Sequence, residues 1–469
     1  MRMTYASGAF EVGQWHRSSA SGGELAPAAI LTSSLAVPLR TTGANSCGEL
    51  PDGAVKVGHW RRIAEKRTTN KRFGRFEGGT IAFRRLALKS LVTRYCKESN
   101  RTPRIMVDSR DLLESETDFG LRLLLASSSS PTFSSRVLSP LSVAHGIALL
   151  HRGFEQGSAA RAELETLVPG LAELELAEQH HFVKVTETRG VDVCSANRVF
   201  VNQRFQLKQV YLDRIRPLRA SAESLNFEEA QKSADVINQF IAQKTDGKIQ
   251  NLVSPDTLKD AFALLVNAVY FKADWLEKFV KDSTVTRHFY TKHEEGREVP
   301  FLNEYETHRD YTEDELFQVL SLPYTDPDFT FVIFLPKLRF GLEPALRRLD
   351  GARFQNLLSD LKNSYVNVHI PKMHIEHETP LKDTLEAVGI SKVFTEHLSS
   401  MADGVKLSSG VHKSVIDVDE EGTRAAAVSV LKARLEMMIM AEPTSFTADH
   451  PFLFAVLHHH RPLFLGLHL

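Results

Sequence analysis

The segment from Val418 to Glu436 reads VDEEGTRAAAVSVLKARLE, and its alternation of side chains governs the interpretation of the whole chain. In a β-strand, every second residue lies on the same face. One face would then carry only small or apolar side chains: Thr423, Ala425, Ala427, Ser429, Leu431 and Ala433. The opposite face would carry all the charges of residues 423–434: Arg424, Lys432 and Arg434. The segment is therefore suited to lie in a sheet with one side buried.

An alanine-rich helix is the alternative for this segment, because alanine, leucine, lysine and arginine are all good helix formers. A run of small residues is also typical of a loop. The local pattern alone leaves these interpretations open, so the choice depends on the rest of the chain.

Patterns of both secondary-structure types follow one another from Asp108 onward. The runs expected to be strands are residues 197–201, 263–271, 329–335 and 366–370. Helices are expected around residues 119–124, after Ser139-Pro140, and over residues 233–245, where Gly247 marks the end. Residues 451–457 and 463–467 indicate a final hairpin. These patterns predict a fold with mixed helices and sheets.

Composition divides the chain near Asp108. The whole chain has 469 residues and a formal net charge of −1, whereas residues 1–107 are basic and poor in apolar periodicity. Their basic pairs are Arg61-Arg62, Lys66-Arg67, Lys71-Arg72 and Arg84-Arg85. We interpret residues 1–107 as a disordered leader or a wrongly predicted extension of the gene. Organelle targeting, nuclear localisation and nucleic-acid binding are the alternatives.

The sequence also argues against several other classes of protein. The longest apolar stretch, from Leu25 to Leu39, contains two prolines and is too short to span a membrane. Cys47, Cys96 and Cys194 form an odd, sparse set that indicates neither disulfides nor a thiolate metal site. We therefore expect a soluble protein in a reducing compartment, the cytoplasm, with an extracellular location as the alternative.

Candidate catalytic and metal-binding residues are few. The chain has no G-x-S-x-G, phosphate-loop, dinucleotide-binding or H-E-x-x-H motif, so we expect no enzyme and no cofactor. The triplet His458-His459-His460 is the strongest metal candidate. Because neighbouring side chains on a strand point to opposite faces, the three cannot all converge, and we expect a turn without a metal.

The segment EEGTRAAA at residues 420–427 resembles the proximal hinge of serpins. Further serpin-like motifs occur in family order along the chain. They are SPLS at 139–142, ANRVF at 196–200, IN at 237–238, TDGKI at 245–249, VNAVYFKADW at 266–275, VHK at 411–413 and DHPFLF at 449–454. The resemblance covers residues 108–469, and it favours the strand interpretation of the hinge over the helical one.

The resemblance implies an α+β serpin fold with three β-sheets, eight to nine helices and an exposed reactive loop. It also implies a suicide inhibitor of serine proteases, whose cleaved loop inserts into the central sheet while the protease is held as a covalent acyl complex. Such a protein is a monomer that can form loop–sheet polymers. A non-inhibitory carrier, storage or chaperone serpin is one alternative, and an inhibitor of acid-preferring or cysteine proteases is another.

Site residues follow from the same resemblance. The hinge comprises Glu420, Glu421, Gly422, Thr423, Arg424, Ala425, Ala426 and Ala427. The shutter and breach of a serpin are the regions where its central sheet must open. The resemblance places Ser139, Ser142, Asn267, His412 and Trp275 in these regions. A hydrogen bond is expected between Asn267 and His412.

The scissile bond is expected among Leu435, Glu436, Met437, Met438 and Met440. The residue spacing usual in inhibitory serpins, counted forward from Gly422, puts the bond after Glu436. The same kind of count backward from Pro451 points to Met440 instead. Because most of these side chains are large and apolar, we expect a chymotrypsin-like target protease.

Overall fold

The computed structural model describes residues 109–127, 134–171, 190–218, 220–292, 295–420 and 442–469. They all belong to one unit, Arg104–Leu469. The predicted leader, residues 1–107, lies outside the described residues. So do the hinge positions from Glu421 to Ala427 and all the reactive-site candidates.

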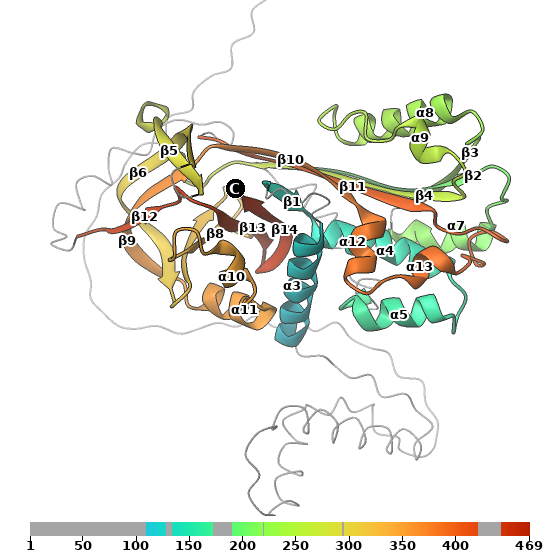
Figure 1. The fold of residues 1–469 in the computed structure, drawn as a ribbon, viewed down its shortest axis with the longest axis horizontal. Helices are drawn as coiled ribbons and strands as arrows, with labels where there is room; N and C mark the ends of the chain where they lie inside the picture. The colour runs from blue at the N-terminus through green and yellow to red at the C-terminus, as the bar shows by residue number, and fades with distance from the viewer. Residues whose placement is uncertain (1–108, 128–133, 172–189, 219, 293–294, 421–441) are drawn as a thin grey trace, which may run out of the picture. The chain divides into compact units, whose positions relative to one another are not determined.

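A five-stranded sheet runs along the length of this unit (Figure 1). Its strands, in spatial order, are β10 (Met373–Pro380), β11 (Ser409–Val418), β4 (Ala263–Ala273), β2 (Val191–Asn202) and β3 (Ser221–Leu225). β4 is apolar along most of its length and almost wholly buried, as its continuous hydrophobic run predicts. β11 pairs with β4 in parallel, whereas β10 pairs with β11 and β2 pairs with β4 in the antiparallel direction.

A second sheet has nine strands. In order these are β1 (Arg136–Leu138), β14 (Arg461–His468), β13 (Phe452–His458), β8 (Phe329–Pro336), β7 (Phe317–Pro323), β6 (Glu295–Glu313), β9 (Lys362–Pro371) and β12 (Thr444–Thr447), while β5 (Val285–Lys292) pairs with β6. The antiparallel pair of β13 and β14 confirms the predicted final hairpin.

The expected number of sheets differs from the observed one. Three sheets were expected, but hydrogen bonding joins the described strands into two. The reason is the length of β6, which spans 19 residues. Its first part pairs with β5, its middle with β9 and its last residues with β7, so a single strand links what would otherwise be separate sheets.

The described residues contain ten α-helices, slightly more than the eight to nine expected. They are α3 (Ser109–Ala126), α4 (Pro140–Gly153), α5 (Ala159–Leu167), α7 (Gln209–Ile215), α8 (Ala230–Lys244), α9 (Pro255–Leu258), α10 (Leu342–Leu346), α11 (Gly351–Ser359), α12 (Leu381–Ala387) and α13 (Lys392–Thr395). The excess comes from α9 and α13, which are single turns of four residues each. Such short helices leave little periodic pattern in a sequence.

Two predicted helix boundaries are confirmed. The Ser139 side chain caps α4 by accepting a hydrogen bond from the Ser142 amide, and Pro140 occupies the first turn. Just beyond α8, Gly247 has a φ of +74°, the left-handed conformation that glycine adopts most easily at a helix end.

The two faces of the five-stranded sheet are covered by different layers (Figure 1). Helices α8 and α9 lie on one side, where Leu264 and Val266 of β4 join their core cluster. Helices α4 and α12 lie on the other side, where Leu265 packs with them. On that same side, Val269 and Phe271 pack with residues of the nine-stranded sheet. Asn267 is two residues from Leu265 and therefore lies on the same face of β4. A polar side chain thus occupies this otherwise apolar inner face.

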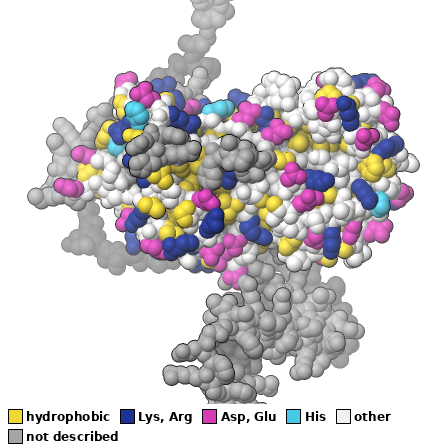
Figure 2. All heavy atoms as spheres, in the orientation of Figure 1, with side chains coloured by type: hydrophobic (Ala, Val, Ile, Leu, Met, Phe, Trp, Pro, Cys, Tyr) yellow, Lys and Arg dark blue, Asp and Glu magenta, His cyan; other side chains and the backbone are white. Residues whose placement is uncertain are grey.

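The described surface carries charges of both signs. Figure 2 shows Lys and Arg side chains interspersed with Asp and Glu side chains over the face in view. None of the described helices combines the length and the hydrophobicity needed to cross a membrane.

Candidate functional site

The parallel pair of β4 and β11 is the feature of the sheet that bears most directly on function. It runs in register from Leu264 opposite Ser409 to Phe271 opposite Ile416. The chain leaves this pair at the end of β11 and is described again from Glu442, before β12 in the nine-stranded sheet. Residues 421–441 therefore connect the two sheets.

A cluster of polar side chains is buried beneath the middle of this pair. Asn267 lies opposite His412 in the ladder, and their side chains are hydrogen bonded, with 2.5 Å between His412 Nδ1 and Asn267 Oδ1. The Ser142 hydroxyl donates to the same Asn267 oxygen at 2.9 Å. Asn267 Nδ2 in turn donates to the Ser142 carbonyl oxygen at 2.9 Å. The start of helix α4 is thus tied to the two strands.

The hydrogen bonds around His412 determine its tautomer. The Ser139 amide donates to His412 Nε2 at 3.1 Å, so this nitrogen is the acceptor. The proton must then lie on Nδ1, which donates to Asn267. The Ser414 hydroxyl, 2.7 Å from Nε2, is a second donor to that nitrogen. A neutral imidazole suits these partners, whereas an added proton on Nε2 would face the Ser139 amide, which can only donate.

Burial favours the same neutral state. His412, Asn267 and Ser414 are 0% exposed, and Ser139 and Ser142 are nearly as buried. Burial lowers the pKa of His412 to about 3, and the neighbouring His377 shifts it in the same direction. The cluster therefore holds no net charge at neutral pH, and its hydrogen-bonding groups are matched to one another.

One nearby polar group is less well satisfied. Thr379 lies opposite His412 on β10, and its buried hydroxyl has no hydrogen-bond partner among the described residues. A buried hydroxyl without a partner costs about 1–3 kcal/mol.

A second group of contacts holds the end of β11. The Trp275 indole donates to the Asp419 carbonyl oxygen at 2.7 Å. The Trp275 ring is buried and stacks on Tyr324 with 4.6 Å between the ring centroids. Lys272 also pairs with the Asp419 carboxylate at 2.9 Å. The chain is thus fixed just before the predicted hinge begins.

Glu420, the first hinge residue, is also anchored. Its carboxylate lies 2.8 Å from Lys372 Nζ, and it accepts a hydrogen bond from the Thr284 hydroxyl at 2.9 Å. Burial works to raise the pKa of this carboxyl, but the bonds with Lys372 and Thr284 lower it by more. The net pKa lies below its ordinary value, so Glu420 remains ionised in this ion pair.

The structure brings together four of the predicted shutter and breach residues: Ser139, Ser142, Asn267 and His412. Trp275 lies apart from them, two residues beyond the end of β4. Ser414 was missed by sequence reasoning. Its spacing of two from His412 on a strand, which places both side chains on one face, is the signal that could have identified it.

Comparisons with known proteins agree with this architecture. Residues 114–469 match the family model described as Serpin (serine protease inhibitor). Iripin-2 of Ixodes ricinus is 31% identical over 361 residues, which cover 74% of this chain and 89% of that protein. Serine protease inhibitor 42Dd of Drosophila melanogaster is 30% identical over 341 residues, with 70% and 89% covered.

Among solved structures, Serpin48, described as a highly specific serpin of the insect Tenebrio molitor, superimposes with a TM-score of 0.67. It shares 26% sequence identity, and the match covers 77% of this chain and 98% of that one.

The first prediction concerns Asn267. Asn267→Ala leaves His412 Nδ1–H and the Ser142 hydroxyl without their acceptor, so we expect the free energy of unfolding to fall by about 2–4 kcal/mol. The resemblance to serpins implies that a loosened pair of strands can also accept a loop from another molecule. We therefore expect faster polymerisation on mild warming, measured by size-exclusion chromatography.

Asn303→Ala is the matched control for this variant. Asn303 is also a buried asparagine, and it is hydrogen bonded to Ser283, Phe301 and His369, but it belongs to the nine-stranded sheet. It should lose stability without polymerising faster. Equal polymerisation rates in the two variants would contradict a special role for Asn267.

The second prediction concerns pH. Above about pH 6.5, His412 is neutral in both the folded and the unfolded chain. Below it, the unfolded chain binds a proton that the folded chain rejects down to about pH 3, so stability falls as the pH falls. His468, with its pKa lowered to about 3 by burial, acts in the same direction.

Chemical denaturation between pH 7.5 and pH 5 measures this effect. His412→Gln should reduce the slope of unfolding free energy against pH by up to about 1.4 kcal/mol per pH unit, because one titrating group is removed. A variant with the same slope as the wild type would show that His412 does not titrate as described.

Proposed function

The chain belongs to the serpin family, and we propose that it inhibits a serine protease as a suicide substrate whose loop, residues 421–441, inserts into the five-stranded sheet after cleavage. Family membership supports protease inhibition in general and argues against an enzyme. The observation that carries the specific mechanism is the direct parallel pairing of β4 and β11, next to the point where the loop begins.

The direction of the strands supports insertion at this position. A segment that leaves the end of β11 and turns back runs antiparallel to β11. Because β4 is parallel to β11, the same segment also runs antiparallel to β4. Insertion would replace one parallel pair with two antiparallel pairs, which are slightly more stable per residue, and would add a full set of ladder hydrogen bonds. The free energy for trapping a protease can come from this change.

The side chains of the hinge fit such an insertion. Thr423, Ala425 and Ala427 would face the inner layer, and their small size allows them to pass between β4 and β11 at little steric cost. Arg424 departs from the neutral or acidic residue usual in a serpin hinge, but its side chain would face outward. This hinge favours an inhibitor over a non-inhibitory carrier, storage or chaperone serpin.

The buried cluster would resist premature insertion. Separating β4 from β11 breaks their ladder and the bond between Asn267 and His412, so the sheet stays closed until cleavage releases the loop. The contacts of Trp275 and Glu420 would hold the end of β11 in the same closed state.

The chemistry of trapping is ordinary acyl transfer. The protease serine attacks the carbonyl carbon before the scissile bond, and the peptide C–N bond breaks. The segment with the new amino terminus leaves, and the carbonyl carbon stays bound to the serine as an ester. Insertion before hydrolysis of this ester gives the covalent complex. We propose a monomer as the active form, a cytoplasmic location consistent with the sparse cysteines, and a chymotrypsin-like protease as the target.

The third prediction tests the hinge. Thr423→Arg places a charge on the face that insertion must bury, which costs several kcal/mol unless the charge is paired. Insertion should slow, and the variant should be cut as a substrate without retaining the protease. The measurement is the yield of denaturant-resistant complex on gels with chymotrypsin.

Ala426→Arg is the matched control, because Ala426 would lie on the outward face of the same strand. It should form the complex as the wild type does. If Thr423→Arg also retains its full yield of complex, the inward assignment of Thr423 is wrong.

The fourth prediction concerns the cleaved bond. Mass spectrometry of the peptide released from the complex should place the cut beside Met437 or Met438, with Glu436 as the site for an acid-preferring protease. Cleavage by a trypsin-like protease at Arg434 would shorten the insertable segment and should give mostly substrate turnover. A new amino terminus at Leu435, or anywhere outside residues 435–440, would show that the predicted loop register is wrong.

A further inference from the structure

The turn between β13 and β14 has an unusual sequence for its geometry. His458 pairs with Arg461 across the hairpin, so His459 and His460 alone form the turn. Their φ values are +48° and +68°. Positive φ at both central residues is what a two-residue type I′ hairpin requires, and asparagine and glycine are the usual residues there. This turn therefore directs the histidine side chains differently from an extended strand.

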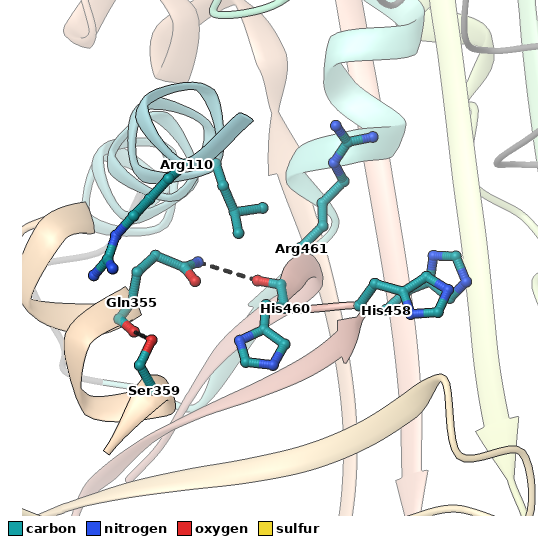
Figure 3. Close-up of a pocket in the computed structure, with 8 residues that line it drawn as sticks. Arg110, Gln355, Ser359, His458, His460 and Arg461 are labelled. Carbon is teal, nitrogen blue, oxygen red and sulfur yellow. Dashed lines mark hydrogen bonds between the residues drawn. The ribbon is translucent and has the colours of Figure 1, made fainter. Parts of the chain in front are cut away.

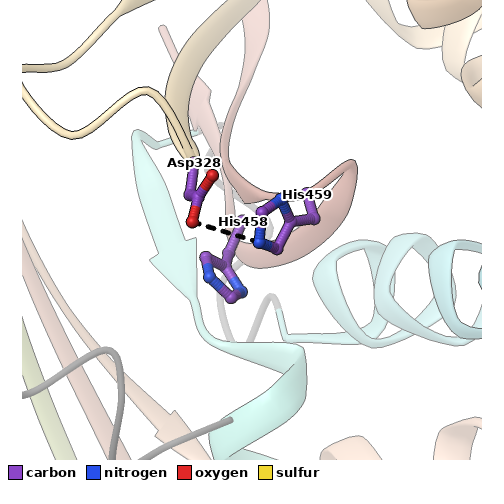
Figure 4. Close-up of side chains that lie close together, drawn as sticks. All are labelled: Asp328, His458 and His459. Carbon is purple, nitrogen blue, oxygen red and sulfur yellow. Dashed lines mark ion pairs between the residues drawn. The ribbon is translucent and has the colours of Figure 1, made fainter. Parts of the chain in front are cut away.

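The turn brings two adjacent histidines together, contrary to the divergence expected for neighbours on a strand. The ring centroids of His458 and His459 are 4.4 Å apart. Asp328 lies beside them, with its Oδ2 atom 3.2 Å from His459 Nε2 (Figure 4). One ligand atom from each of these three residues lies within 4.8 Å of the other two.

The backbone holds this group in place. The His459 amide donates to the Asp328 carbonyl oxygen at 3.0 Å, which fixes the two turns against each other. The Asp328 amide donates to the Asp326 side chain at 2.9 Å. His458 is buried, with its ring 4.8 Å from that of Phe329. The side chains of His459 and Asp328 remain 59% and 51% exposed, so both have room to rotate.

We propose that Asp328, His458 and His459 bind a Zn²⁺ ion. Two imidazoles and a carboxylate form a donor set typical of zinc, whereas Ca²⁺ and Mg²⁺ prefer sites built from oxygen atoms. Bonds of about 2.0–2.2 Å in a tetrahedral site place ligand atoms roughly 3.4 Å apart. Separations as wide as 4.8 Å must therefore shorten by up to about 1.4 Å, which rotation of the two exposed side chains can provide.

A cavity next to the turn supplies the fourth position. It has a volume of about 400 Å³, and all three consecutive histidines line it. Such a space admits water to a metal held by three protein ligands. Figure 3 shows His460 on the side of Gln355 and Ser359, apart from His458. The His460 carbonyl oxygen accepts a hydrogen bond from Gln355 at 3.1 Å, which fixes this side of the turn. Its ring is not among the ligand groups that lie close together, so His460 is excluded from the proposed ligand set.

The proposed site is independent of the proposed inhibitory mechanism. It connects the turn before β8 with the turn after β13, and both strands belong to the nine-stranded sheet rather than to the sheet that would open. A metal that binds the folded chain and not the unfolded one raises its thermal stability. Zn²⁺ should thus stabilise the fold without being needed for complex formation.

Calorimetric titration of the metal-free full chain with Zn²⁺, together with thermal unfolding with and without Zn²⁺, tests the proposal. Replacing an outer-shell partner of a metal ligand already costs about 10–100-fold in affinity, so His459→Ala and Asp328→Asn should each raise the zinc Kd at least about tenfold. Both variants should also lose the zinc-dependent rise in unfolding temperature.

His460→Ala is the matched control, because it removes a histidine from the same turn but not from the ligand set. It should bind Zn²⁺ as the wild type does. An unchanged zinc response in His459→Ala would place the metal elsewhere in the chain and overturn the proposal. So would a wild type without any zinc response, or a loss of binding in His460→Ala equal to that in His459→Ala.

Discussion

The direct pairing of β4 with β11, fixed at its middle by Asn267 and His412, is the constraint on which the rest of the structure depends. The two side chains lie opposite each other in the ladder and share a hydrogen bond in a fully buried position. A slip of one residue in this register would separate them and leave buried polar groups without partners. The same cluster includes Ser139 and Ser142, so it also fixes the start of α4 beneath the sheet.

This kind of constraint suits the proposed mechanism, in which the sheet stays closed until the loop is cut. A matched polar cluster makes the closed state specific, because each lost bond exposes another unsatisfied group. The buried Thr379 hydroxyl, opposite His412 on β10, has no partner among the described residues.

Sequence reasoning succeeded where burial leaves a simple pattern. The continuous apolar run of β4 and the two runs of the final hairpin were predicted because strands covered by other layers are apolar along their length. The burial of the predicted shutter residues Ser139, Ser142, Asn267 and His412 has no such pattern behind it. Buried serine, asparagine and histidine look the same in a sequence as exposed ones, so only the resemblance to serpins predicted that these residues lie together.

The remaining misses come from long-range geometry. The linkage of the nine-stranded sheet depends on which strands pair along β6, and a single sequence does not specify this pairing. The approach of His458 and His459 depends on positive φ values at histidines, where glycine or asparagine would be expected.

The most direct test of the account compares thermal unfolding before and after cleavage within residues 435–440. If the loop inserts between β4 and β11, the cleaved chain gains a strand and should unfold at a markedly higher temperature than the intact one. A cleaved chain that unfolds at the same or a lower temperature would contradict insertion and the mechanism built on it.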